Sequence, residues 1–153
     1  MAKTKTQINL KLRIPRVVMD LRNADPSLLE LMIPGLDHLT ARFHVIGDGA
    51  EGLPHVFSLE EAIEEADIWV VFSRDLPKDF SMIIQEGIVP VMMNGVHPKA
   101  ENYSAIEEKG NAFLFPRLTS WTVYGSLVRA IENFAFPHDW QNLKSHGKTL
   151  KKV

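Results

Sequence analysis

Short apolar segments rich in β-branched residues alternate along this chain with segments of helical periodicity. Two of the apolar segments, residues 68–72 and 89–93, are almost continuously hydrophobic. Such runs are typical of strands that are buried on both faces, as the strands of a parallel sheet are. Strands and helices in alternation therefore predict a parallel sheet with helices packed on both of its faces.

The whole pattern predicts an α/β fold: a single Rossmann-like, three-layer α/β/α domain with a mostly parallel sheet of about six strands. The expected strands are residues 17–21, 43–46, 55–57, 68–72, 89–93 and 112–115. The expected helices are residues 27–32 (ended by Pro34-Gly35), one capped by Ser58, residues 80–86, residues 103–109, one capped by Ser120 and a last one capped by Asp139. Ligands of such folds bind beyond the carboxyl ends of the strands, where the strand order reverses.

The chain has no internal repeat, linker or low-complexity tract, so we expect one domain at residues 14–147. A polar lead-in at residues 1–13 precedes it, and a basic, lysine-rich tail at residues 148–153 follows it. A length of 153 residues with 45% hydrophobic residues is enough for one sizeable core.

Composition excludes several classes of function. A net charge of −2 and a pI near 6.3 give no electrostatic basis for binding nucleic acid or an anionic membrane. No apolar run reaches the roughly 18 residues of a membrane span, and no signal peptide is evident. The absence of cysteine excludes disulfides and thiolate chemistry and is consistent with a reducing compartment, so we expect a cytoplasmic protein.

Two candidate binding stretches follow predicted strands. Gly47 and Gly49 resemble a glycine-rich phosphate turn but lack the third glycine and the helix start of a dinucleotide fingerprint, so a tight strand exit explains them better. Ser73 and Arg74 offer a hydroxyl and a guanidinium that could hold a phosphate. A surface Arg74 paired with Asp75 explains the second stretch equally well.

Two further stretches are weaker candidates. Phe80 and Ser81 begin a helix whose free amides could bind an anion, but Asp79 is expected to cap this helix and repel a phosphate. Gly95 permits a turn after a strand, and His97 in that loop could contact a ligand, although a lone loop histidine is more often exposed. The spacing of the six histidines predicts no metal site.

Asp20 differs from the other carboxylates, because it lies inside an apolar strand near its carboxyl end. Such an aspartate can bind a ribose, a metal or a basic partner, and more often turns outward or caps a neighbouring loop. No arrangement of Ser, His and Asp and no nucleophile elbow stands out, so the sequence identifies no catalytic residue.

Five motifs occur in a familiar order: residues 41–50 with a Gly-Asp-Gly turn, 55–61, 66–74, 87–92 and 110–115. Together they resemble the C-terminal, nucleotide-sugar-binding domain of GT-B glycosyltransferases, especially the retaining group-1 (family 4) type. The resemblance extends over about residues 17–147. It implies that a sugar donor binds through its diphosphate and that transfer occurs in a cleft shared with an acceptor-binding domain.

The chain departs from this family at important positions. The family uses an Arg and a Lys after the first strand; Arg22 matches the Arg, but residues 23–26 supply no Lys. Phe80-Ser81 stands where the family has Phe-Gly, and no pair of glutamates has the required spacing. At 153 residues the chain has no room for a second, acceptor-binding domain, so a water-excluding cleft would need a partner.

These features predict a glycosyltransferase-like donor domain that binds a nucleotide or nucleotide-sugar weakly, has no cofactor or metal, and is inactive in transfer by itself. The alternative is a non-catalytic Rossmann-like module with a decayed site that acts through protein–protein interaction. The expected partner is an acceptor-domain chain or a second copy. The diphosphate would lie between Arg22 and the helix start at Phe80. The expected ligand contacts are Arg22, Asn23, Gly47, Gly49, Ser73, Arg74, Phe80, Ser81, Gly95 and His97.

Overall fold

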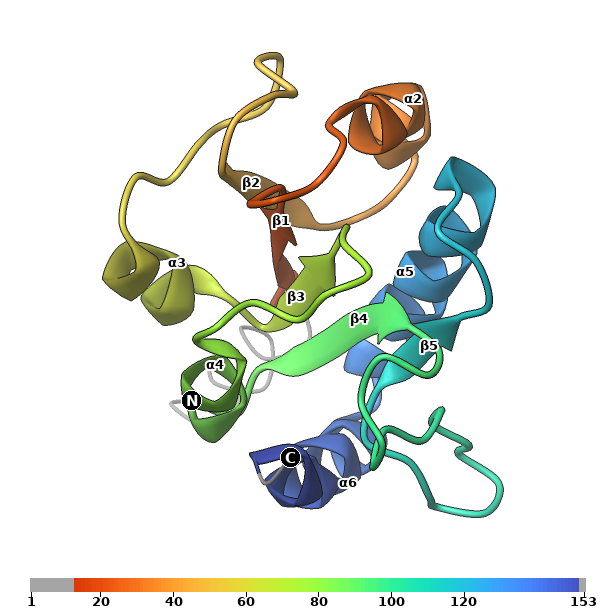
Figure 1. Cartoon of the computed structure of the whole chain (residues 1–153). Helices are drawn as coiled ribbons and strands as arrows, with labels where there is room; N and C mark the ends of the chain where they lie inside the picture. The colour runs from red at the N-terminus through yellow and green to blue at the C-terminus, as the bar shows by residue number, and fades with distance from the viewer. Residues whose placement is uncertain (1–12, 152–153) are drawn as a thin grey trace, which may run out of the picture.

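A five-stranded, fully parallel sheet forms the middle layer of the computed structural model, which describes residues 13–151 (Figure 1). The strand order is β2-β1-β3-β4-β5. The strands are β1 (Arg16–Asp20), β2 (Arg42–Ile46), β3 (Ile68–Val71), β4 (Val89–Met93) and β5 (Phe113–Phe115). The predicted α/β, Rossmann-like class is confirmed.

The helices lie on both faces of this sheet. On one face, α2 (Ser27–Leu36), α5 (Ser120–Phe134) and α6 (Pro137–His146) share an apolar cluster with the sheet. On the other, α3 (Leu59–Glu65), α4 (Phe80–Gln85) and the 3-10 helix η1 (Gly147–Lys151) share a second cluster. Val17 and Met19 belong to the first cluster and Val18 to the second, as the alternation of side chains along a buried strand requires.

The predicted sixth strand, residues 55–57, is wrong. Only a single bridge joins His55 to Val45. The chain leaves the sheet at once because Ser58 caps α3, accepting a hydrogen bond from the Glu61 amide at 3.1 Å.

The predicted helix at residues 103–109 is also wrong. Backbone hydrogen bonds in both directions join Ser104 and Lys109, at 2.8 and 3.2 Å, and they close the segment into a turn. The Tyr103 hydroxyl donates a 2.6 Å hydrogen bond to Asp139 and so holds this turn against α6.

Three helix ends differ from expectation. Helix α2 continues through Pro34 and Gly35 instead of ending there. Helix α5 is capped by Thr119, in a reciprocal pair of contacts with Thr122, rather than by Ser120. Helix α6 begins at Pro137, whose missing N–H is tolerated in a first turn, rather than after an Asp139 cap.

The segment expected as the start of a basic tail packs into the domain. Leu150 of η1 is fully buried, and its carbonyl accepts a 3.0 Å hydrogen bond from His97 Nε2. Ser81 donates a hydrogen bond to the Lys151 carbonyl. Residues 1–12 of the expected lead-in and residues 152–153 of the expected tail lie outside the described residues. No helix within 13–151 is long and apolar enough to cross a membrane.

We expect Leu150→Ala to lower the free energy of unfolding by about 3 kcal/mol, because it removes a fully buried side chain and leaves a cavity. The matched control is Ile106→Ala, since Ile106 is exposed and should change stability by less than about 0.5 kcal/mol. Urea unfolding measures both. Equal stability of the two variants would show that η1 does not pack against the sheet.

Candidate functional site

The strand order reverses between β1 and β3. The chain passes from β1 to β2 on one side and then returns to place β3 on the other side of β1. Parallel α/β folds bind their ligands at this kind of switch point. A pocket of about 420 Å³ opens there, and its walls include Asp20, Arg22, Asn23, Val71, Ser73 and Asp79.

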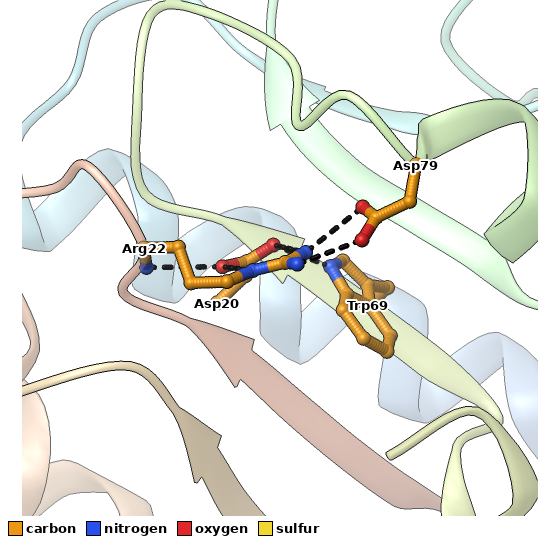
Figure 2. A network of polar contacts seen from close by, with 4 residues as sticks. All are labelled: Asp20, Arg22, Trp69 and Asp79. Carbon is orange, nitrogen blue, oxygen red and sulfur yellow. Dashed lines mark hydrogen bonds and ion pairs between the residues drawn. The ribbon is translucent and has the colours of Figure 1, made fainter. Parts of the chain in front are cut away.

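A buried aspartate forms the floor of this pocket. Asp20, the last residue of β1, is 2% exposed and accepts four hydrogen bonds (Figure 2). Three come from Arg22: its backbone amide and Nε at 3.0 Å, and Nη2 at 2.8 Å. The fourth comes from Trp69 Nε1 of β3 at 3.0 Å. The carboxylate thus has the hydrogen-bond donors that a buried charge requires.

A second carboxylate covers the outer edge of Arg22. Asp79, just before α4, accepts hydrogen bonds from Arg22 Nη1 at 2.8 Å and Nη2 at 3.0 Å, a bidentate pair (Figure 2). Asp79 occupies the N-cap position of α4 as expected, but its side chain makes no capping hydrogen bond to the helix. The Asp79 carboxylate, which the local sequence pattern predicts to bind the α4 amides, binds the Arg22 guanidinium instead.

Arg22 is consequently held between two anions. Its hydrogen bonds to Asp20, and then those to Asp79, raise the pKa of the guanidinium above its ordinary value despite the opposing effect of burial. Three carboxylates, Asp20, Asp75 and Asp79, line the pocket against the two cations Arg22 and Lys78. In this arrangement the pocket has no surplus of positive charge for a phosphate.

The glycine turn after β2 packs against the loop that carries Arg22. A Cβ on Gly47, at φ +108°, would lie 2.8 Å from the Arg22 backbone nitrogen, and one on Gly49, at φ +113°, would lie 2.2 Å from Pro26 Cβ. Both glycines are therefore required by close backbone approach and a left-handed conformation. Together with Arg22 and the exposed Phe57 they also line a second hollow of about 680 Å³.

The structure divides the predicted ligand contacts into groups. Arg22, Asn23, Gly47, Gly49 and Ser73 line the two hollows at the switch point.

Phe80, Ser81 and His97 instead lie around η1. His97 is buried, its ring is 6.0 Å from that of Phe80, and its Nδ1 accepts the Lys99 amide, so Nε2 carries the proton that bonds Leu150. Gly95 forms an open turn, and Arg74 is exposed. The predicted contact set is thus spread over separate parts of the domain.

Sequence analysis missed two members of the network. Trp69 looked like an ordinary residue of an apolar strand, and Asp79 looked like a helix cap. The available signal was Asp20 itself, since a carboxylate at a buried strand end needs both cationic and neutral donors. No group of three or more metal-ligating side chains within 13–151 could hold a metal ion.

Comparisons with known proteins point in one direction. A segment of 86 residues, 54% of this chain, is 31% identical to Glycogen synthase 1 of Synechocystis sp. and covers 18% of that protein. The catalytic domain of cholesterol-α-glucosyltransferase from Helicobacter pylori has a similar fold, with a TM-score of 0.59, 14% identity, and coverage of 90% of this chain and 99% of that domain. No protein-family model matches the chain.

The chain is glycosyltransferase-like. This finding confirms the predicted resemblance to the C-terminal type of GT-B domain, and at 14% identity the structural likeness concerns the fold. The chain spans less than a fifth of the length of the synthase that it matches.

We expect Arg22→Ala to lower the free energy of unfolding by about 3 kcal/mol, because it leaves the buried Asp20 carboxylate without a charged partner. Arg74→Ala removes an exposed arginine at the end of the neighbouring strand and should cost less than about 0.5 kcal/mol. Chemical denaturation of both variants gives the comparison. A cost no greater for Arg22→Ala than for Arg74→Ala would show that the ion pair does not support the fold.

Proposed function

We propose that this chain is a glycosyltransferase donor domain that binds a nucleoside diphosphate, free or within a nucleotide-sugar, weakly in the pocket between β1 and β3. Transfer of the sugar would require a partner domain or chain. The observation that supports this proposal is the position of Arg22, a guanidinium at the switch point of a glycosyltransferase-like parallel sheet.

Two groups in the pocket suit a diphosphate. Arg22 can present Nη1 and Nη2 to a pair of phosphate oxygens in the way that it now presents them to Asp79. The Ser73 hydroxyl oxygen accepts a hydrogen bond from the Asp75 amide at 3.1 Å. Its proton has no acceptor among residues 13–151, so it can be donated to a ligand. These donors come from the ends of adjacent strands and face one pocket.

Weak binding follows from the same geometry. A phosphate must displace the Asp79 carboxylate from Arg22, and exchanging one anion for another adds little favourable free energy. Asp20 and Asp75 remain in the pocket and repel a ligand of two or more negative charges. Asp79 therefore acts as an internal competitor for the ligand.

Dependence on a partner follows from the openness of the pocket. Arg22 keeps 28% of its side chain exposed, so water reaches the groups that would face a departing diphosphate. Glycosyl transfer benefits from a dry, preorganised site, which a second domain closing over this edge of the sheet would create.

A second candidate function is a non-catalytic interaction module. It is favoured because Asp20 and Asp79 together already accept four hydrogen bonds from the Arg22 guanidinium, so most of its donors are paired without a ligand. The two candidates differ in one property: only a donor domain binds a nucleoside diphosphate at Arg22.

We expect one of UDP, GDP and ADP to bind, with a Kd of about 0.1–1 mM by calorimetry. Asp79→Asn should tighten binding by about tenfold, because it removes the competing charge from Arg22. Asp75→Asn, the matched control, removes the same charge from the same pocket without touching Arg22, and should change Kd much less. Arg22→Ala should abolish binding. Absence of binding in both the wild type and Asp79→Asn would support the interaction module instead.

We expect the isolated chain to transfer no sugar from UDP-, GDP- or ADP-glucose to an α-glucan or a sterol. We choose these acceptors because one similar protein is a glycogen synthase and the other is a cholesterol-α-glucosyltransferase. The measurement is release of nucleoside diphosphate with and without acceptor, with a complete glycogen synthase as the positive control. Turnover by this chain alone would contradict its dependence on a partner.

A further inference from the structure

A hollow of about 310 Å³ lies where α4, α6 and η1 meet (Figure 1). Lysine supplies all of the charged side chains in its walls: Lys144 comes from α6, and Lys148 and Lys151 come from η1. The other polar side chains of the walls are neutral: Gln85, Gln141 and Ser145. The lining thus carries positive charge alone.

These lysines are not neutralised within the described part of the chain. None of their three ammonium groups forms an ion pair with a carboxylate of residues 13–151. Glu86 precedes the wall residue Gly87 in the chain but does not itself line the hollow. The sequence contains no acidic residue after Asp139, whose carboxylate accepts the Tyr103 hydroxyl. Positive charge is therefore concentrated here in a chain whose net charge is −2.

The spacing of the lysines also disfavours an empty hollow. Lys144, Lys148 and Lys151 follow one another at i, i+4 and i+7, and like charges at i and i+4 repel each other. One lysine in the last turn of α6 suits the negative end of the helix dipole, but Lys148 and Lys151 lie beyond that turn. An anion bound among the three lysines would replace this repulsion by attraction.

Packing and hydrogen bonding hold two of the lysines in position. A Cβ on Gly87, at φ +80°, would lie 3.1 Å from Lys144 Cε, so the Lys144 stem lies across this glycine just after α4. The Lys151 carbonyl accepts a hydrogen bond from the Ser81 hydroxyl of α4 at 3.2 Å. The hollow is therefore largely formed before a ligand arrives, which lowers the entropic cost of binding.

A neighbouring hollow of about 730 Å³ is less suited to an anion. Lys148 lines both hollows, and Lys99 and Lys109 line the larger one. The larger hollow also contains Glu101 and Glu108 in its walls. These carboxylates offset the lysines and would repel an anion, so the smaller hollow is the better anion site.

The smaller hollow lies far along the fold from the proposed nucleotide site. Gly87 comes just before β4, so this hollow is at the edge where the parallel strands begin. The pocket between β1 and β3 lies at the opposite edge, where the strands end, and the two share no wall residue. Any ligand of the lysines therefore occupies a second, separate site.

We propose that the hollow between α4, α6 and η1 binds a phosphomonoester group through Lys144, Lys148 and Lys151. A phosphomonoester carries nearly two negative charges and three acceptor oxygens, whereas a carboxylate carries one charge and two oxygens. Three ammonium groups match the phosphomonoester better, and Ser145 adds a neutral donor. The group belongs to a soluble phosphorylated compound or to a lipid headgroup, since both present this chemistry. Binding is weak, with a Kd of about 1 mM, because solvent reaches the lysines.

Backbone amide chemical shifts of the full chain, followed during a titration with inorganic phosphate at constant ionic strength, test the site. The amides of Gly87, Ser145 and Lys148 should shift and saturate with a Kd of about 1 mM. No saturable shift at these amides up to about 20 mM phosphate overturns the proposal. Saturation confined to the amides of Arg22 and Gly47 also overturns it, because the phosphate would then occupy the switch point.

Substitution of the lysines tests which hollow binds. Lys144→Gln should raise the Kd for phosphate about threefold, and a triple variant that also carries Lys148→Gln and Lys151→Gln should bind no phosphate. Lys109→Gln, the matched control, removes the same charge from the larger hollow alone and should raise Kd by less than about 1.5-fold. Thermal unfolding checks that each variant is folded. Equal weakening by Lys109→Gln and Lys144→Gln overturns the proposal.

Vesicles distinguish the two sources of the phosphomonoester. The probe is phosphatidylcholine with about 10% phosphatidic acid, and the control replaces phosphatidic acid by phosphatidylserine, which is anionic without a phosphomonoester. Cosedimentation with phosphatidic acid that the triple variant loses identifies a lipid headgroup. Phosphate shifts without cosedimentation identify a soluble compound. Equal binding to both kinds of vesicle overturns recognition of a phosphomonoester. The triple variant should bind nucleoside diphosphate like the wild type, so the two proposed sites can fail or hold independently.

Discussion

The buried carboxylate of Asp20 is the constraint on which the site depends. A charge this deep in the domain must be matched by donors, and Arg22 and Trp69 supply them from the loop after β1 and from β3. Arg22 then holds Asp79 in front of α4. One electrostatic requirement thus joins two strands and a helix at the edge of the sheet where ligands of such folds bind.

In this network, the ion pair that stabilises the fold also competes with the proposed binding of a nucleoside diphosphate. The proposed ligand needs the face of Arg22 that Asp79 now occupies, so whatever strengthens the ion pair weakens the site. The family resemblance implies a lysine after β1 and a pair of glutamates before β4, and the absence of both agrees with weak binding of a sugar nucleotide. The likeness to glycosyltransferases explains the scaffold, and Asp79 accounts for the weak binding that we propose on it.

Prediction from sequence succeeded where the signal is local. Residues 68–71 and 89–93 are strands as expected, because continuous β-branched runs have few other stable environments. The helix predicted at residues 103–109 is wrong because backbone hydrogen bonds between Ser104 and Lys109 close a turn, which helical periodicity does not reveal. The basic tail predicted at residues 148–153 was expected to be exposed because it is rich in lysine. Leu150 within it is instead buried in the second apolar cluster.

The amino-acid sequence by itself determined the three-layer parallel α/β architecture, since periodicity, caps and turn residues act over a few neighbours. It also indicated Asp20 as unusual and Arg22 as the candidate phosphate contact. Only the tertiary structure decided that Arg22 and Asp79, 57 residues apart, neutralise each other, and that His97 holds η1 rather than facing the switch point. Such pairings depend on where separate elements meet in space, and no local pattern in the chain encodes that meeting.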